Sequence, residues 1–125
     1  MANVSYLKFR KRAPAKRAKF GNKKIELDGI KFDSLAEANR YCALKLRVRI
    51  GEIRDLELQP RFDIIVNGVK VAYYKADFRY RVAATGEVVV EDVKSPITAE
   101  DATFRLKKKL VEALHQIKVR ILLNR

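Results

Sequence analysis

Apolar residues recur at the spacing of an amphipathic helix in two segments of the chain. The first segment covers residues 33–50, begins with Asp33-Ser34 and stops at Gly51. The second covers residues 98–116, with Thr98 as the expected N-cap. We therefore expect two helices, separated by residues 51–97.

Strand patterns account for most of the remaining residues. Asn67-Gly68 favours a type I′ turn and sits between two apolar runs, which predicts a hairpin of residues 62–66 and 69–73. Asp28-Gly29 predicts a smaller hairpin within residues 24–32. Further extended segments are expected at residues 53–58, 77–82, 88–94 and 119–123.

The expected order is therefore helix, three or more strands, helix, strand. This order is typical of an α/β domain in which helices flank a central sheet. The sequence shows neither an internal repeat nor a second domain, so we expect one domain over residues 23–125.

Positive charge is concentrated before that domain. The chain carries a net charge of +13, and residues 1–24 contain nine lysines and arginines but no acid. We predict that residues 1–22 form a flexible basic arm, and that the protein binds nucleic acid. The candidate DNA-contacting residues of the arm are Lys8, Arg10, Lys11, Arg12, Lys16, Arg17 and Lys19. A merely solubilising or targeting tail is the alternative.

The sequence argues against several other classes of protein. No apolar run approaches the roughly 20 residues that a membrane span needs. Cys42 is the single cysteine, so an internal disulfide is impossible, and we expect a buried, inert thiol. We therefore expect a cytoplasmic protein with no membrane partner.

Asp92 and Lys94 form the first part of a candidate active site. Side chains two residues apart on a strand point to the same face, so Asp92 and Lys94 should project together, while Glu91 and Val93 point the other way. A carboxylate can bind Mg²⁺, and a nearby ammonium group can stabilise charge on a phosphate. Glu91 is the alternative ligand if a twist or bulge reverses the strand.

Asp77 and Glu37 are the candidate second and third carboxylates. Asp77 begins the strand that should pair antiparallel with the strand ending at Lys94, which would bring Asp77 near Asp92. Glu37 begins an otherwise apolar stripe on the first helix. Ser34 and Glu37 also have the spacing of a capping box, so Glu37 is either a catalytic and metal-binding residue or a helix cap.

Four more basic residues are candidates for contact with DNA. Lys75 lies two residues before Asp77, so it shares a face with Asp77 if the segment is extended. The others lie in the second helix, where they either contact phosphates or form a solvated face: Arg105, Lys107 and Lys108.

These motifs resemble the PD-(D/E)XK, or restriction-endonuclease-like, nuclease superfamily, which includes Holliday junction resolvases. Asp77 matches the metal-binding Asp of this superfamily, and Asp92-Val93-Lys94 matches its (D/E)-x-K motif. Glu37 matches a Glu that lies on a helix in several branches of the superfamily. A family of small, largely uncharacterised phage and prophage proteins is more similar still, over residues 29–34, 36–38, 56–60, 76–78 and 90–94. Ala76 and Ser95 depart from the Pro and Gly that are frequent at these places.

The resemblance implies an α-β-β-β-α-β core with a mixed central sheet, and a hydrolase that cuts DNA. Catalysis would involve Glu37, Asp77, Asp92 and Lys94, with Mg²⁺ (or Mn²⁺) held by the three carboxylates and no small-molecule cofactor. By analogy we expect a homodimer that acts on branched DNA such as Holliday junctions, in phage recombination or replication within a bacterial cell. The alternative is a non-catalytic nucleic-acid-binding protein that retains the nuclease fold.

Overall fold

A computed structural model of the chain describes residues 24–124, which form two compact units. The first unit ends at Arg49 and the second begins at Ile50. The predicted arm of residues 1–22 lies outside the described residues. Within residues 24–124, no helix is long and apolar enough to cross a membrane.

The first unit is a hairpin followed by a helix. Strands β1 (Ile25–Leu27) and β2 (Ile30–Phe32) pair antiparallel, and α1 (Leu35–Arg49) packs against both. The Asp28-Gly29 turn has positive φ at both residues, as predicted. The buried side chains of this unit are Ile25, Leu27, Phe32, Ala38, Tyr41 and Leu44.

Part of the predicted apolar face of α1 is solvent-exposed. Leu35, Leu46 and Val48 are exposed, because only the stripe through Ala38, Tyr41 and Leu44 is covered. Cys42 was predicted to be buried, but it is only half-buried. Its burial nevertheless raises the pKa of the thiol, so that Cys42 is uncharged at neutral pH.

Tyr41 joins the helix to the turn of the first unit. Its hydroxyl donates a hydrogen bond of 3.0 Å to Asp28, whose carboxylate also pairs with Lys45. The bond to Lys45 is the main reason that the pKa of Asp28 is lowered. Burial, followed by the Asp28 hydrogen bond, raises the pKa of Tyr41 to about 12.

Tyr41 should therefore make stability sensitive to alkaline pH. Its ordinary pKa is 10.0, so as pH rises the unfolded chain loses this proton before the folded chain does. The contribution is complete below pH 10.0 and is lost as pH rises to about 12. Urea unfolding across that range should show a smaller loss of unfolding free energy for Tyr41→Phe than for the unaltered protein. Equal losses would contradict this account.

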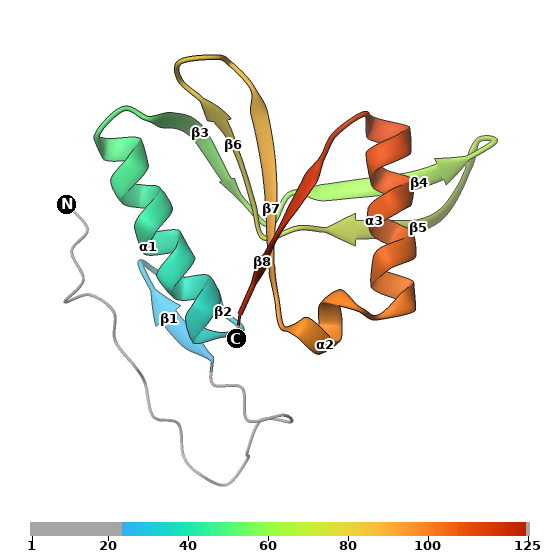
Figure 1. Cartoon of the computed structure of the whole chain (residues 1–125), viewed down its shortest axis with the longest axis horizontal. Coiled ribbons are helices and arrows are strands. Elements are labelled where there is room, and N and C mark those ends of the chain that lie inside the picture. The colour runs from blue at the N-terminus through green and yellow to red at the C-terminus, as the bar shows by residue number, and fades with distance from the viewer. Residues whose placement is uncertain (1–23, 125) are drawn as a thin grey trace, which may run out of the picture. The chain divides into compact units, whose positions relative to one another are not determined.

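The second unit contains a four-stranded mixed sheet with the order β3-β6-β7-β8 (Figure 1). Strand β6 (Phe78–Val82) pairs antiparallel with both β3 (Ile53–Leu58) and β7 (Val88–Lys94), whereas β8 (Val119–Leu123) is parallel to β7. The predicted α/β class, with helices and a mixed sheet, is thus confirmed.

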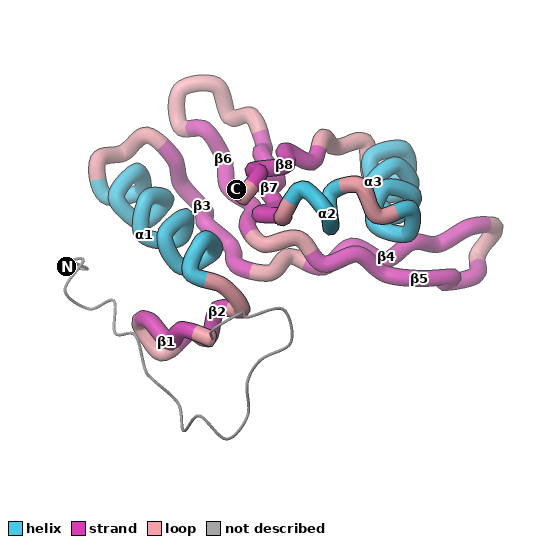
Figure 2. Tube along the Cα trace, turned by 60° about the horizontal axis from the view of Figure 1, so that its bottom comes forward, coloured by secondary structure: helices cyan, strands magenta, loops and turns pink. Residues whose placement is uncertain are grey.

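A hairpin is inserted between β3 and β6, formed by β4 (Arg61–Val66) and β5 (Val69–Lys75). Its Asn67-Gly68 turn has positive φ at both residues, as a type I′ turn requires. Figures 1 and 2 show the hairpin extending away from the four-stranded sheet, with α3 (Ala102–His115) along one side of it. His115 attaches this helix to β4, because its Nε2 lies 2.8 Å from the Asp63 carbonyl oxygen.

The core of the second unit lies beneath α3. It combines side chains from the hairpin, from the central sheet and from the helix, so it fixes the position of β5 relative to β7. Its buried members are Phe62, Ile64, Tyr74, Ala76, Val90, Val111 and Val119.

The segment between β7 and α3 differs from the prediction. Thr98 is not the N-cap of a continuous helix, because it lies inside a separate short helix, α2 (Pro96–Ala99). Ser95 caps α2 and accepts a hydrogen bond from the Thr98 backbone N–H. Asp101 caps α3 in the same way through the Phe104 N–H. Pro96 suits the first turn of α2, because that position needs no backbone donor.

Candidate functional site

The candidate site is built around Asp92, which lies near the end of β7 and is 0% exposed. The strand projects Asp92 and Lys94 to the same face, and Lys94 Nζ lies 3.5 Å from Asp92 Oδ1. The ammonium group also lies 5.1 Å from the centre of the Phe104 ring on α3. Lys94 is therefore placed between a carboxylate and an aromatic ring, while remaining partly accessible to solvent.

Tyr74 on β5 supplies the hydrogen bond to the other oxygen of Asp92. Its hydroxyl donates to Asp92 Oδ2, and both side chains are buried. Burial raises the pKa of Tyr74, and the negative charges of Asp92, Asp77 and Glu112 raise it further. Tyr74 is therefore a protonated, donating group throughout the physiological pH range.

Asp77 occupies the bend between β5 and β6, one residue before β6 begins. Backbone hydrogen bonds fix this bend from both sides: Ala76 N donates to Pro60 O (3.0 Å), Asp77 N to Glu91 O (3.1 Å) and Gln59 N to Asp77 O (2.8 Å). The Asp77 main chain is thus held against β3 and β7 at once.

The Asp77 side chain lies beside the Asp92-Val93-Lys94 segment. Its Oδ2 accepts a hydrogen bond of 2.7 Å from the Val93 backbone N–H. Phe78 pairs with Glu91 at the end of the β6–β7 register, and the Asp77 N–H donates to the Glu91 carbonyl, so Asp77 lies directly beside this end of β7. The negative charges of both Asp77 and Asp92 act on the Tyr74 hydroxyl. The structure therefore brings Asp77, Asp92 and Lys94 together. We call these three residues and Tyr74 the carboxylate site.

Asp92 Oδ1 is a buried atom of the carboxylate site that receives no hydrogen bond from residues 24–124, although Lys94 lies nearby. A buried carboxylate oxygen is costly unless a donor or a cation compensates it. Asp77 and Asp92, which both lie near Tyr74, offer the oxygen ligands that Mg²⁺ prefers. The residues present therefore fit a divalent cation held by Asp77 and Asp92.

The third predicted ligand, Glu37, belongs to the first unit, where its backbone N–H donates a hydrogen bond of 3.1 Å to Ser34 Oγ. This bond is the Ser34 half of the predicted capping box. Among residues 24–124, no group of three or more His, Cys, Asp or Glu side chains is arranged to hold a metal ion.

Glu91 lies on the opposite face of β7 from the carboxylate site. It is 0% exposed, like Asp92, and it accepts a hydrogen bond from the Tyr80 hydroxyl on β6. Each of these two adjacent acids thus accepts a hydrogen bond from a tyrosine hydroxyl, and the two tyrosines lie on different strands. The pairing of β7 with β8 runs from Val90 to Lys94 without a register shift, so Asp92, not Glu91, is the acid beside Lys94.

The predicted DNA-contacting residues of the second unit have different surroundings. Arg105 pairs with Glu100 at 3.7 Å, and Lys108 with Glu112 at 3.1 Å. Lys107 lies 5.8 Å from the centre of the Tyr73 ring, and Lys75 is exposed at the end of β5. The candidate residues of the arm, from Lys8 to Lys19, lie outside the described residues.

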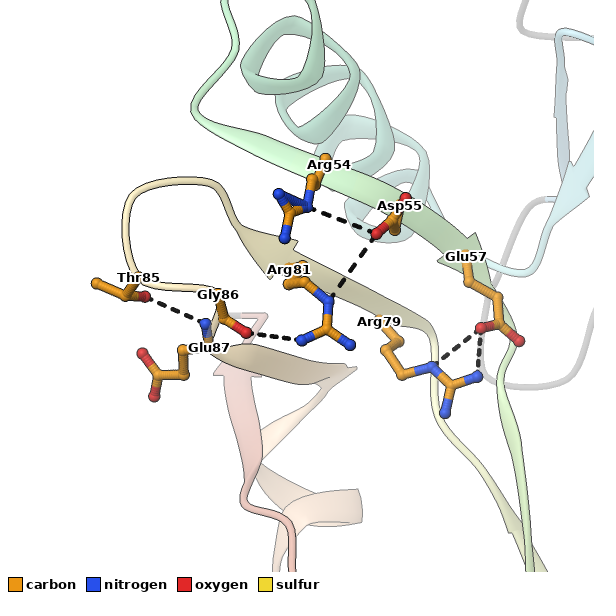
Figure 3. A network of polar contacts seen from close by, with 8 residues as sticks. All are labelled: Arg54, Asp55, Glu57, Arg79, Arg81, Thr85, Gly86 and Glu87. Carbon is orange, nitrogen blue, oxygen red and sulfur yellow. Dashed lines mark hydrogen bonds and ion pairs between the residues drawn. The ribbon is translucent and has the colours of Figure 1, made fainter.

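The outer side of β3 and β6 carries a separate network of arginines (Figure 3). Asp55 lies 3.7 Å from Arg54 and 3.9 Å from Arg81, and Arg79 binds Glu57 through two nitrogens. Arg81 also donates a hydrogen bond of 2.8 Å to the Gly86 carbonyl. These arginines are therefore largely neutralised by contacts within the sheet.

Sequence reasoning missed two residues of the site, Tyr74 and Phe104. Both read as ordinary core residues, because their contacts with Asp92 and Lys94 depend on how the hairpin and α3 pack. The only signal for Tyr74 was its position three residues before Asp77.

The fold and the site define a mixed α/β protein in which two acids and a lysine converge at the end of one strand pair. The chain belongs to the DUF1064 family, described as a "Protein of unknown function", whose model matches residues 17–123. Searches of curated proteins and of solved structures found no match.

Proposed function

We propose that this protein is a Mg²⁺-dependent endonuclease that hydrolyses DNA phosphodiester bonds on a restriction-endonuclease-like, PD-(D/E)XK fold. The observation that carries the proposal is that the Asp77 carboxylate is bonded to the Val93 N–H, between Asp92 and Lys94, while Lys94 lies beside Asp92 on the same face. The order α1, β3, β6, β7, α3, β8 supports it, as does the parallel pairing of β8 with β7.

The protein groups would divide the work as follows. Asp77 and Asp92 would hold the divalent ion, which supplies polarisation of the phosphate and a lowered pKa for water. Tyr74 and the Val93 N–H orient the two carboxylates, each by one hydrogen bond. Lys94 can stabilise the charge that develops on the phosphate, because its ammonium group is positioned before substrate arrives.

The substrate we propose is branched DNA, such as a four-way junction. A chain of this size has little surface for reading base sequence, which favours recognition of DNA structure. Cutting two strands symmetrically would require a homodimer. The testing experiment incubates the pure protein with a junction, a flap, a linear duplex and single strands, each with Mg²⁺ and with EDTA. Mg²⁺-dependent cleavage of the junction supports the proposal, and intact DNA in every reaction refutes it.

The second candidate is a non-catalytic nucleic-acid-binding protein with the same fold. It is favoured by the net charge of +13, which fits a polyanionic partner whether or not the protein cuts it. The same reactions separate the candidates, because a binding protein would shift the mobility of the DNA in native gels without cutting it.

Tyr74→Phe should distinguish a metal-binding carboxylate from a merely structural one. Losing a hydrogen bond to a buried carboxylate should lower the free energy of unfolding by about 2 kcal/mol. It should also raise the Mg²⁺ concentration needed for half-maximal cleavage by about tenfold, because Asp92 is less well oriented. Urea unfolding in EDTA and a Mg²⁺ titration of cleavage measure the two effects.

Tyr80→Phe is the matched control, because Tyr80 donates to Glu91 on the other face of β7. It should also destabilise the fold, yet leave the Mg²⁺ dependence of cleavage unchanged. If both variants shift the Mg²⁺ requirement equally, Tyr74 has no particular role at the site.

A further inference from the structure

The β4–β5 hairpin has one face that α3 does not cover. Ala72 and Tyr74 belong to the face that contributes to the core under the helix. Tyr73 and Lys75 alternate with these residues, point the other way and are exposed. The register shift after Ile64 places Lys70 opposite Ile65, on the same side as Tyr73. Figures 1 and 2 both show α3 on only one side of the hairpin. We call the opposite side its outer face.

Tyr73 is surrounded by cations on this outer face. Tyr73 is 44% exposed. The Arg61 guanidinium lies 4.0 Å from the centre of the ring, and the ammonium groups of Lys107 and Lys70 lie at 5.8 and 6.0 Å. An accessible aromatic ring beside several cations is the combination that single-stranded nucleic acids require, because bases stack on the ring while phosphates contact the cations.

The positive charge on the outer face is only partly neutralised. Arg61 stands directly opposite Lys75 in the strand register, a pairing of like charges that destabilises a hairpin. Asp63 is shared between Arg61 at 3.5 Å and Lys70 at 3.4 Å. Within the described part of the chain, Lys75 and Lys107 form no ion pair. The three arginines on the outer side of β3 and β6, by contrast, share two carboxylates, Asp55 and Glu57 (Figure 3).

We infer that the outer face of the β4–β5 hairpin binds a DNA strand with unpaired bases. Tyr73 stacks on a base, while Arg61, Lys70, Lys75 and Lys107 contact the neighbouring phosphates. The inference rests on the proposed function only in taking DNA as the partner. It does not depend on Asp77 or Asp92, so it can be tested without metal.

The experiment measures binding of the full-length protein to a fluorescein-labelled single strand by fluorescence anisotropy in EDTA. Tyr73→Ala should weaken binding by about tenfold, whereas Tyr73→Phe, which keeps the ring, should bind almost normally. Arg61→Ala should reduce the slope of log affinity against log salt by about 0.7, because one phosphate contact is lost. Binding that is unchanged in Tyr73→Ala would overturn the inference.

Arg54→Ala is the matched control for charge. Arg54 and Arg61 are similarly exposed, at 55% and 51%, and each lies within 4 Å of one aspartate. Arg54→Ala should leave the salt slope unchanged. If the salt slope falls equally in Arg54→Ala and Arg61→Ala, DNA binding depends on the total charge of the protein and not on the hairpin, and the inference is overturned.

A tryptophan reporter tests stacking directly, because the chain contains no tryptophan. The fluorescence of Tyr73→Trp should be quenched by the single strand, and that of Val88→Trp, at an exposed position on β7, should not. If Tyr73→Ala instead converts a dimer to a monomer in sedimentation, the outer face joins two copies and the inference fails. Normal Tyr73-dependent binding without any cleavage by the protein would refute only the proposed endonuclease.

Discussion

Asp77→Asn and Asp92→Asn should each lower the rate of Mg²⁺-dependent DNA cleavage by about a thousandfold or more. A bound divalent ion contributes several kcal/mol of transition-state stabilisation, which neutral amide ligands would forfeit. DNA binding in EDTA should be unchanged or tighter, because each variant removes negative charge near the phosphate. Single-turnover cleavage and anisotropy measure the two quantities separately.

These substitutions are chosen because asparagine keeps the hydrogen bonds that the structure shows. In Asp77→Asn the new amide oxygen can still accept from the Val93 N–H, and in Asp92→Asn it can still accept from the Tyr74 hydroxyl. The folds should therefore survive. Asp92→Asn should even leave the free energy of unfolding equal or higher, since it removes a buried charge. Loss of cleavage in a protein that is equally or more stable would identify a functional role and not a structural one.

Glu91→Gln is the control for a buried acid on the same strand. Glu91 and Asp92 are adjacent, equally buried and each bonded to a tyrosine, but they face opposite sides of β7. Glu91→Gln should therefore retain cleavage under conditions in which Asp92→Asn has none. The reverse result would transfer the site to the Glu91 face, and normal cleavage by both Asp variants would remove the site altogether.

Local signals explain why so much of the fold was predictable. Asp28-Gly29 and Asn67-Gly68 each impose a turn through positive φ, which in turn sets the register of both hairpins. Alternation along β7 was enough to put Asp92 and Lys94 on one face. The prediction that one helix starts at Thr98 was wrong, because two other residues in this segment are N-caps: Ser95 caps α2 and Asp101 caps α3.

What could not be predicted depends on contacts between distant segments. Asp92 is buried beneath Tyr74, which lies 18 residues earlier in the chain, at the end of the inserted β4–β5 hairpin. The position of Lys94 against Phe104 requires α2 to turn the chain before α3 begins. Sequence spacing therefore identified the charged groups of the site, whereas packing determines which neighbours hold them in place.

The ammonium group of Lys94, like the two carboxylates, should be necessary for DNA cleavage. Lys94→Met keeps an unbranched apolar side chain that can still lie against Phe104, but it removes the ammonium group. Removing one preorganised electrostatic group from an active site typically costs about 10²-fold in rate. We expect a loss of this size in single-turnover cleavage at saturating protein, with little change in DNA affinity.

Lys108→Met provides the comparison that makes the Lys94 result interpretable. The two lysines are 25% and 26% exposed, and each pairs with a carboxylate, Asp92 or Glu112. If Lys108 contacts DNA at all, it contacts a phosphate away from the carboxylate site. Its loss should then weaken binding but leave the saturated rate unchanged. The two lysines differ in that only Lys94 lies beside Asp92. If Lys94→Met and Lys108→Met lower the saturated rate equally, Lys94 acts only through the net charge of the protein.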